Sequence, residues 1–267
     1  MILNTIRLVD LVKDEWFLTK IYDNYDLVVS DFDFWGKVKN IVSIKDILDL
    51  DRNKRILFVL DQLLIENILD NFDGKSFDIL DMNFGVASVG QKIAISKIDI
   101  QEIIERWFDI YEPFDQATLL FDLSKKWNKY IRINNFYLPD DFGVGTKDIL
   151  SLAEKWIYGD DFTLVFTGSM LSESIRLTNL LNEKWLTVNI MILNKLNFDL
   201  LDIEGEKIIF AIDQLNGKRY EDFVKSRLKW KNIKFLYPEY DSITTVFDEY
   251  QLEEAKFDAK GLFERMV

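Results

Sequence analysis

The sequence predicts an α/β fold of two domains, each a mainly parallel sheet flanked by helices. Short apolar runs rich in β-branched residues alternate along the chain with segments whose apolar residues recur every three to four positions. Such alternation is typical of parallel sheets, because each helix returns the chain to the edge where the next strand begins. The clearest example is residues 159–214, which read as a strand, a helix and two further strands.

Within that segment, residues 163–166 are an apolar run between Asp-Asp and Thr-Gly, a pattern that indicates a buried strand. Gly168 and Ser169 then turn the chain, and the Ser169 hydroxyl can cap the helix that follows. Two more strands are expected at 186–193 and 207–212. A strand–helix–strand unit of this length implies a parallel pair.

The segments before and after follow the same logic. Residues 1–26 are expected to be helical, since their apolar residues share one broad face. Further strands are predicted at 26–30, 40–43, 55–60, 77–80, 92–96, 110–111, 130–133 and 234–236. Further helices are predicted from residue 45 and at 61–72, 98–108, 116–129, 220–228 and 244–266.

One stretch interrupts this alternation. Residues 136–147 (FYLPDDFGVGTK) combine one Pro, two Gly and two Asp without any periodicity, which favours a linker. We therefore predict a first domain at 1–135, a linker at 136–147 and a second domain at 148–267.

Composition excludes several classes of protein. A chain of 267 residues that is 48% hydrophobic can bury a large core, so wholesale disorder is excluded. Its net charge of −13 disfavours nucleic acid and anionic membranes as partners. No apolar run approaches the roughly 20 residues that span a bilayer, and the N-terminus lacks a signal-peptide pattern. We expect a soluble, cytoplasmic protein.

Cysteine and histidine are both absent. Their absence removes thiolate nucleophiles, the usual zinc ligands and any Ser-His-Asp or Cys-His catalysis. Carboxylates, Lys, Arg, Tyr and hydroxyl groups remain for chemistry. No metal-binding residue is predicted in this chain alone.

The second half resembles the C-terminal domain of the transketolase family of thiamine-diphosphate enzymes. Residues 158–169 (YGDDFTLVFTGS) are similar to the family's "reGdDvtlvatGs" segment. Residues 186–196 and 207–213 are similar to two of its strands, and 246–263 to its ending "eeLleeygLdaegI". Residues 142–147 stand where the family has its "iGka" linker. These short matches occur in the family's order.

The first half resembles the family's pyrimidine-binding domain. Residues 58–66 (FVLDQLLIE) are similar to "vgiaEqnmvgia", whose Glu hydrogen-bonds the aminopyrimidine of the cofactor. The resemblance implies that Asp61 is the cofactor-activating carboxylate and that Gln62 also binds the cofactor. Residues 130–135 are similar to the "yiRlpR" strand, which implies a substrate- or anion-binding role for Arg132.

Two of these residues have a simpler interpretation. Asp61 follows an apolar strand and precedes a predicted helix. In the simpler interpretation its role is limited to capping the N-terminus of that helix. That interpretation is favoured, because Asp is one methylene shorter than the family's Glu and would have to move to act on the cofactor. Ser169 can bind an anion at a helix N-terminus, or it can be a plain cap.

The resemblance also has gaps. The family's diphosphate-binding domain, with its GDG…N metal motif, is absent. Thiamine diphosphate and Mg²⁺ would therefore bind only together with a partner chain that supplies this domain, in a homodimer or heterotetramer. The implied function is a subunit of a split thiamine-diphosphate enzyme that acts on sugar phosphates or 2-oxo acids.

A second hypothesis is a catalytically degenerate relative with a structural or regulatory binding role. The missing histidines and the trimmed segment 81–98 favour it. A distant third is a phosphatase that uses Asp31 and Asp33 as a DxD pair. There Phe34 follows the second Asp, where that class has Gly-Thr, so the motif fails.

Overall fold

The structure is a computed structural model, and it describes most of the predicted strands and helices. The described residues are 5–6, 19–21, 23–30, 41–42, 53–60, 65, 68–70, 77–81, 86–89, 92–95, 98–113, 116–125, 128–133, 138–139, 153–157, 161–197, 203, 205–213, 217–229, 231–243 and 248–266.

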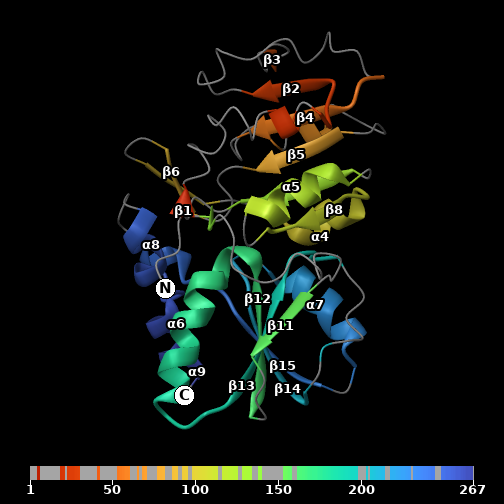
Figure 1. Cartoon of the computed structure of the whole chain (residues 1–267). Helices are drawn as coiled ribbons and strands as arrows, with labels where there is room; N and C mark the ends of the chain where they lie inside the picture. The colour runs from red at the N-terminus through yellow and green to blue at the C-terminus, as the bar shows by residue number, and fades with distance from the viewer. Residues whose placement is uncertain are drawn as a thin grey trace.

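Two large sheets organise these residues (Figure 1). The first has six strands in the order β3-β2-β4-β5-β9-β8, and every neighbouring pair is parallel. Its strands are β2 (Leu27–Ser30), β3 (Ile41–Val42), β4 (Ile56–Leu60), β5 (Phe77–Asp81), β8 (Asp109–Tyr111) and β9 (Lys129–Arg132). The predicted α/β class is confirmed for this part of the chain.

The second sheet has five strands in the order β11-β13-β12-β14-β15. These are β11 (Ala153–Ile157), β12 (Phe162–Thr167), β13 (Val188–Leu193), β14 (Lys207–Ala211) and β15 (Asn232–Leu236). Only β11 runs antiparallel to its neighbour. The predicted strand–helix–strand unit is confirmed as β12, α6 (Leu171–Asn182) and the parallel strand β13.

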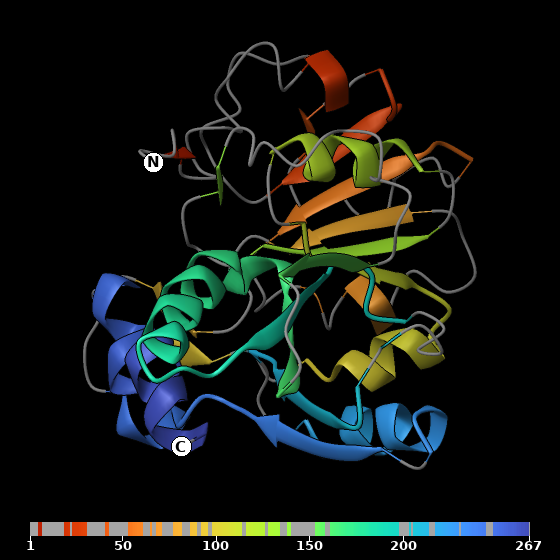
Figure 2. The same cartoon turned by 60° about the horizontal axis from the view of Figure 1, so that its bottom comes forward.

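Helices cover both faces of the second sheet. Alternate residues of its strands point to opposite sides, so one face carries Leu164, Phe166 and Ile190, which pack against α6 and α9 (Ala259–Met266). Figure 2 shows the dark blue C-terminal helices beside the green helix α6. The other face carries Val165 and Phe210, which share a core with α7 (Lys218–Arg227).

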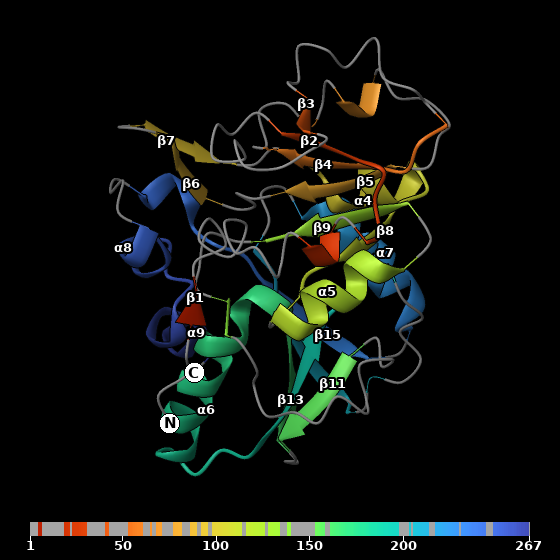
Figure 3. The same ribbon diagram turned by 45° about the horizontal axis from the view of Figure 1, so that its top comes forward.

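The same core continues into the first sheet. Phe58, Ile79 and Tyr130 from alternate positions of its strands belong to one apolar cluster with α4 (Ile100–Glu105) and with the inner face of the second sheet. The opposite face lies towards α5 (Gln116–Ser124). Two small antiparallel pairs complete the described strands: β1 (Thr5–Ile6) with the distant β10 (Leu138–Pro139), and the hairpin of β6 (Val86–Val89) with β7 (Lys92–Ile95). The second pair lies beside α8 (Asp248–Glu254) (Figure 3).

The edge strand β8 joins the two sheets. The segment after β13 pairs antiparallel with it: the Glu112 N–H donates to the Asn194 carbonyl at 2.8 Å, and the Leu196 N–H donates to the Ile110 carbonyl at 2.9 Å. Gly168, directly after β12, packs against the same strand end. A Cβ at this position would lie 1.8 Å from the Glu112 carbonyl oxygen. Only glycine therefore permits so close an approach.

Several predicted elements differ from the structure. Of the segment 1–26, expected to be helical, residues 19–21 are helical but residues 5–6 form a strand. Helix α5 ends at Ser124, and the buried Lys129 ammonium binds the Leu123 carbonyl that a further helical turn would use. The helix expected at 244–266 is two helices, α8 and α9, separated by Lys256 with φ 50°. Ser169 is not the cap of α6, whose N-cap is Met170 after a 3-10 turn at Gly168–Met170.

Trp107 and Trp185 have left-handed backbones, with φ of 67° and 60°, and their side chains are 89% and 92% exposed. Each follows a helix, where glycine normally supplies this conformation. Because the rings bury little surface, Trp107→Gly and Trp185→Gly should each raise the free energy of unfolding by about 0.5–1 kcal/mol. Urea unfolding measures the change. Tyr250→Gly is the control: this exposed aromatic lies in helix α8, so glycine there should destabilise. Losses in both Trp variants would contradict the prediction.

Gly168→Ala should have the opposite effect. Its methyl group would meet backbone atoms of Glu112 and Pro113 that cannot rotate away, so we expect a loss of about 1–3 kcal/mol. Ser226→Ala, at an exposed position of α7, should stay within about 0.5 kcal/mol of the parent. Equal midpoints in chemical denaturation for the two variants would show that the two sheets do not press together at this point.

Candidate functional site

The topology of the first sheet marks one place for a ligand. The chain passes from β2 to β3 on one side, and then from β4 to β5 on the other. In such sheets a crevice opens at the carboxyl ends of the two strands where the order reverses. Here these are β2, which ends at Ser30, and β4, which ends at Leu60. The predicted cofactor residues, Asp61 and Gln62, directly follow in the sequence the strand β4 whose carboxyl end borders this crevice.

Asp61, Gln62 and the alternative pair Asp31 and Asp33 lie outside the described residues. Their roles stay predictions. The strand that precedes Asp61 in the sequence is described, and all five residues of β4 are buried.

The second sheet has an equivalent reversal between β12 and β14. Residues of the first sheet fill this place. The Glu112 carbonyl lies against Gly168 after β12, and Arg132 Nη2 donates to the Asp213 carbonyl after β14 at 2.7 Å. The crevice in which doubly wound sheets bind ligands is thus occupied by the chain itself. Ser169 lies in the turn beside it, and its predicted anion-binding role remains a prediction.

Arg132 is at the centre of this contact. Its side chain is completely buried, and Nη2 lies 3.3 Å from Glu112 Oε2, whose side chain is also buried. A buried ion pair of this kind is strongly destabilised when one partner is removed. The guanidinium has no contact with solvent in this arrangement, so binding of a substrate anion, as predicted, would require the contacts with Glu112 and Asp213 to open.

Two buried tyrosines donate hydrogen bonds to carboxylates nearby. Tyr240 donates to Asp213 Oδ1, and Tyr130 donates to Asp81 Oδ2 at 2.6 Å. Burial, reinforced by the neighbouring carboxylate, raises the pKa of Tyr240 and of Tyr130 well above the ordinary value. Both phenols therefore stay protonated and act as fixed donors at the carboxyl ends of β14 and β5.

A second polar cluster lies at the opposite, amino-terminal edge of the first sheet. Asp78 on β5 accepts from the Tyr25 hydroxyl at 2.7 Å and lies 3.0 Å from the Lys129 ammonium and 3.4 Å from Arg55. Burial lowers the pKa of Lys129 to about 8, although Asp78 opposes the shift. Because parallel strands bind ligands at their carboxyl ends, we assign this cluster to stability.

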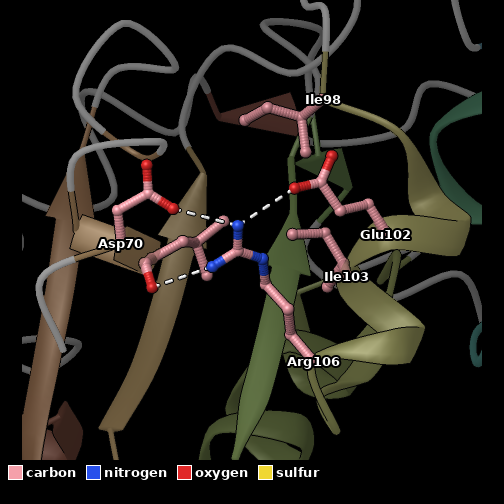
Figure 4. A pocket seen from close by; sticks show the side chains of 6 residues that line it. Asp70, Ile98, Glu102, Ile103 and Arg106 are labelled. Atoms are coloured by element: carbon pink, nitrogen blue, oxygen red, sulfur yellow. Dashed lines mark hydrogen bonds and ion pairs between the residues drawn. The ribbon is translucent and has the colours of Figure 1, made fainter. Parts of the chain in front are cut away.

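A pocket of about 230 Å³ lies between α4 and the helical residues 68–70. Figure 4 shows Arg106 reaching across it to Asp70 and Glu102, at 3.0 and 3.1 Å, and to the Leu69 carbonyl at 2.9 Å. The polar groups of Asp70, Glu102 and Arg106 in the pocket thus bond to one another. The Arg106 guanidinium thereby links α4 to the helical residues 68–70.

Membrane-spanning helices and metal clusters are both absent from the described ranges. None of the helices there combines the length and apolar character needed to cross a bilayer. No group of three or more His, Cys, Asp or Glu side chains in these ranges is arranged to hold a metal ion.

Sequence reasoning missed Glu112, Asp213, Asp122 and Asn194 as members of the contact between the sheets. The distance along the chain explains this: the Asn194–Asp122 hydrogen bond joins residues 72 positions apart. Glu112 directly follows a predicted strand and precedes Pro113, which was the one local signal that the strand ends there.

Arg132→Met should remove the cation of the buried ion pair with Glu112, at a loss of about 3–5 kcal/mol. Arg176→Met removes an arginine with a similar 2.8 Å ion pair to Glu173 but a 70% exposed side chain, and should lose less than about 1 kcal/mol. The double variant Arg132→Met/Glu112→Gln should recover part of the loss. If the two arginine variants unfold at the same urea concentration, Arg132 does not hold the sheets together.

Comparison with known proteins gives no match by family models or among curated proteins. Solved structures do match. A split-gene transketolase, described as an inactive tetramer of its beta chain (beta4), is 12% identical with a TM-score of 0.67 over 97% of this chain and 96% of that one. The transketolase of Campylobacter jejuni is 11% identical with a TM-score of 0.69 over 98% of this chain and 46% of its own length.

A transketolase variant from Pichia stipitis, in complex with xylulose 5-phosphate, matches with a TM-score of 0.69 at 11% identity over 98% of this chain and 45% of that one. This chain thus spans less than half the length of these two enzymes, but nearly all of the split-gene chain. At such low identity the matches establish the fold alone. They confirm the resemblance that the sequence indicated: the chain has a divergent form of the transketolase C-terminal fold.

Proposed function

We propose that the chain is one subunit of a split thiamine-diphosphate enzyme of transketolase type. The observation that carries the proposal is the end-to-end match with a split-gene transketolase chain, over 97% of this chain and 96% of that one. The unit of structure is therefore a separate chain in at least one similar protein. A partner chain would supply the diphosphate-binding domain, and the assembled protein would act in the cytoplasm on sugar phosphates or 2-oxo acids.

The domain division belongs to the same proposal. Residues 1–135 would form the pyrimidine-binding domain around the first sheet, 136–147 the linker, and 148–267 the C-terminal domain around the second. The boundary falls between β9 and β11, and thus between the two sheets. The assembly would be a homodimer of this chain with two partner chains, which is a heterotetramer.

The residues available at the carboxyl end of β4 fit the cofactor in their chemistry. Thiamine diphosphate, when bound, supplies the carbanion chemistry of ketol transfer or decarboxylation. Asp61 would accept a hydrogen bond from the pyrimidine ring and favour one protonation state of its nitrogen, and the Gln62 amide would fix the orientation of the ring. Mg²⁺ and the diphosphate would be held by the partner.

One observation favours a second function, a structural or regulatory subunit without catalysis. The Arg132 guanidinium, for which the resemblance implies a substrate contact, is completely buried against Glu112 and Asp213. A chain that retains its fold but uses this arginine internally could stabilise a catalytic partner while contributing no substrate-binding residue.

Calorimetric titration separates the two functions. The chain would be purified together with a chain that carries the GDG…N diphosphate-binding domain, and thiamine diphosphate with Mg²⁺ titrated into the complex. We expect binding at one site per pair of chains, weakened about tenfold or more by Asp61→Ala, because one charge-assisted hydrogen bond contributes about 1.5–3 kcal/mol. Asp70→Ala, an exposed carboxylate 3.0 Å from Arg106, is the control and should bind as the parent does.

Binding that is unaffected by Asp61→Ala would remove Asp61 from the site and favour the structural subunit. A complex that forms but binds no cofactor would rule out the catalytic assignment altogether.

A further inference from the structure

A buried side-chain hydrogen bond joins α5 to the end of β13. Asn194 Nδ2 donates to Asp122 Oδ1 at 3.2 Å, and both side chains are buried, with 4% and 0% of the surface of each residue exposed. Helix α5 lies where the first sheet meets the second (Figure 3). The backbone of Asn194 also binds the first sheet, through its carbonyl and the Glu112 N–H. Asn194 thus holds both α5 and β8.

One oxygen of the Asp122 carboxyl group and the single oxygen of the Asn194 amide lack a hydrogen-bond donor among the described residues. Asp122 Oδ2 and Asn194 Oδ1 are buried, and neither has a hydrogen-bond partner within the part of the chain that the structure describes. A buried acceptor without a donor is costly, about 1–3 kcal/mol for each group. An ionised carboxylate and an amide oxygen cannot satisfy each other, because neither carries a hydrogen.

One proton would satisfy both atoms at once. A carboxylic acid facing a carboxamide forms two antiparallel hydrogen bonds, one in each direction. We propose that Asp122 and Asn194 form a proton-operated latch between the two sheets: proton uptake at Asp122 Oδ2 makes it a donor to Asn194 Oδ1, while Asn194 Nδ2 continues to donate to Asp122 Oδ1. The latch concerns the joint between the sheets and does not depend on the proposed cofactor.

Charged groups from each neighbouring element act on Asp122. From the end of α5, the Lys125 ammonium lies 2.7 Å from Asp122 Oδ1 and favours the ionised form. The buried Lys129 on β9 acts in the same direction from farther away. Tyr111 on β8 faces both Asp122 and the carboxylates of Asp109 and Asp78, and Lys125 lies 4.0 Å from the centre of its ring.

Lys195, the neighbour of Asn194, is held by a different carboxylate. Its ammonium lies 2.7 Å from Asp109 Oδ1. Two lysine–aspartate pairs of equal length therefore lie at the same joint. Asp122 accepts from the Asn194 amide, whereas Asp109 accepts from the Asn197 amide. This arrangement provides matched controls.

Burial outweighs these cations: it raises the pKa of Asp122 from the ordinary 3.8 to about 6, while Lys125 and Asn194 oppose the shift. Because the folded chain binds this proton more tightly than the unfolded chain, the contribution to stability is complete below about pH 4. It is lost as the pH rises through about 6. The latch, meaning the hydrogen bond from protonated Asp122 Oδ2 to Asn194 Oδ1, therefore forms in mildly acidic solution and is lost at neutral pH.

The test compares urea unfolding between pH 4.5 and 8 for the parent chain, Asp122→Asn and Asp109→Asn. The amide that Asp122→Asn introduces would make both hydrogen bonds to Asn194 without a proton. At each pH, the folded-to-unfolded ratio of the parent is divided by that of Asp122→Asn. This quotient should be about tenfold higher at pH 5 than at pH 7. Asp109→Asn should show the same step, that is, the same tenfold change in stability between pH 5 and pH 7. Parallel profiles for the parent and Asp122→Asn would overturn the proposal, as expected if a buried water served the two oxygens instead.

A second pair of variants moves the midpoint and does not require Asp122→Asn to fold. Lys125→Met removes the cation beside Asp122 and should shift the step towards higher pH by at least half a unit, with its amplitude preserved. Lys195→Met, which breaks the pair with Asp109, should leave the midpoint unchanged. A step that stays in place in Lys125→Met, or that moves equally in both lysine variants, would contradict a proton held between Asp122 and Asn194.

Discussion

The contact of Arg132 with Glu112 and the Asp213 carbonyl is the constraint on which the arrangement of the two sheets depends. It brings the carboxyl ends of β9 and β14 together and places the Glu112 carbonyl over Gly168. Removing these charges from water is expensive, and only good geometry offsets it. The contact therefore selects one relative placement of the sheets, and the apolar cluster that runs through both completes it.

This contact divides the two crevices of the fold by role. Both sheets reverse their strand order, and both could in principle bind a ligand there. The chain fills one crevice itself, through Arg132 and Glu112. The crevice after β2 and β4 is the one for which we propose the cofactor. A fold-level argument alone would have treated both as sites.

The sequence was sufficient to predict the buried strands, because β4, β12 and β13 are apolar runs that no surface helix would tolerate. It was insufficient for β11 (AEKWI), an antiparallel edge strand whose mixed composition carries no clear period. The break between α8 and α9 was also missed, since Lys256 takes a left-handed conformation that a packed neighbour, Gly261, accommodates. The pairing of β11 with β13, the contact of Arg132 with Asp213 and the hydrogen bond of Asp122 with Asn194 all join residues distant in sequence, which local patterns do not predict.

The closing of strand β8 by residues 194–196 has a consequence for how such chains diversify. The first sheet is completed by backbone from the second half, so the two halves share one hydrogen-bonded seam as well as one core. In a hybrid that joined the first half of this chain to the second half of a relative, β8 and Arg132 would face residues other than 194–196 and Asp213, their partners here. The two halves are therefore expected to change together in descent, and exchange of either one alone should be rare.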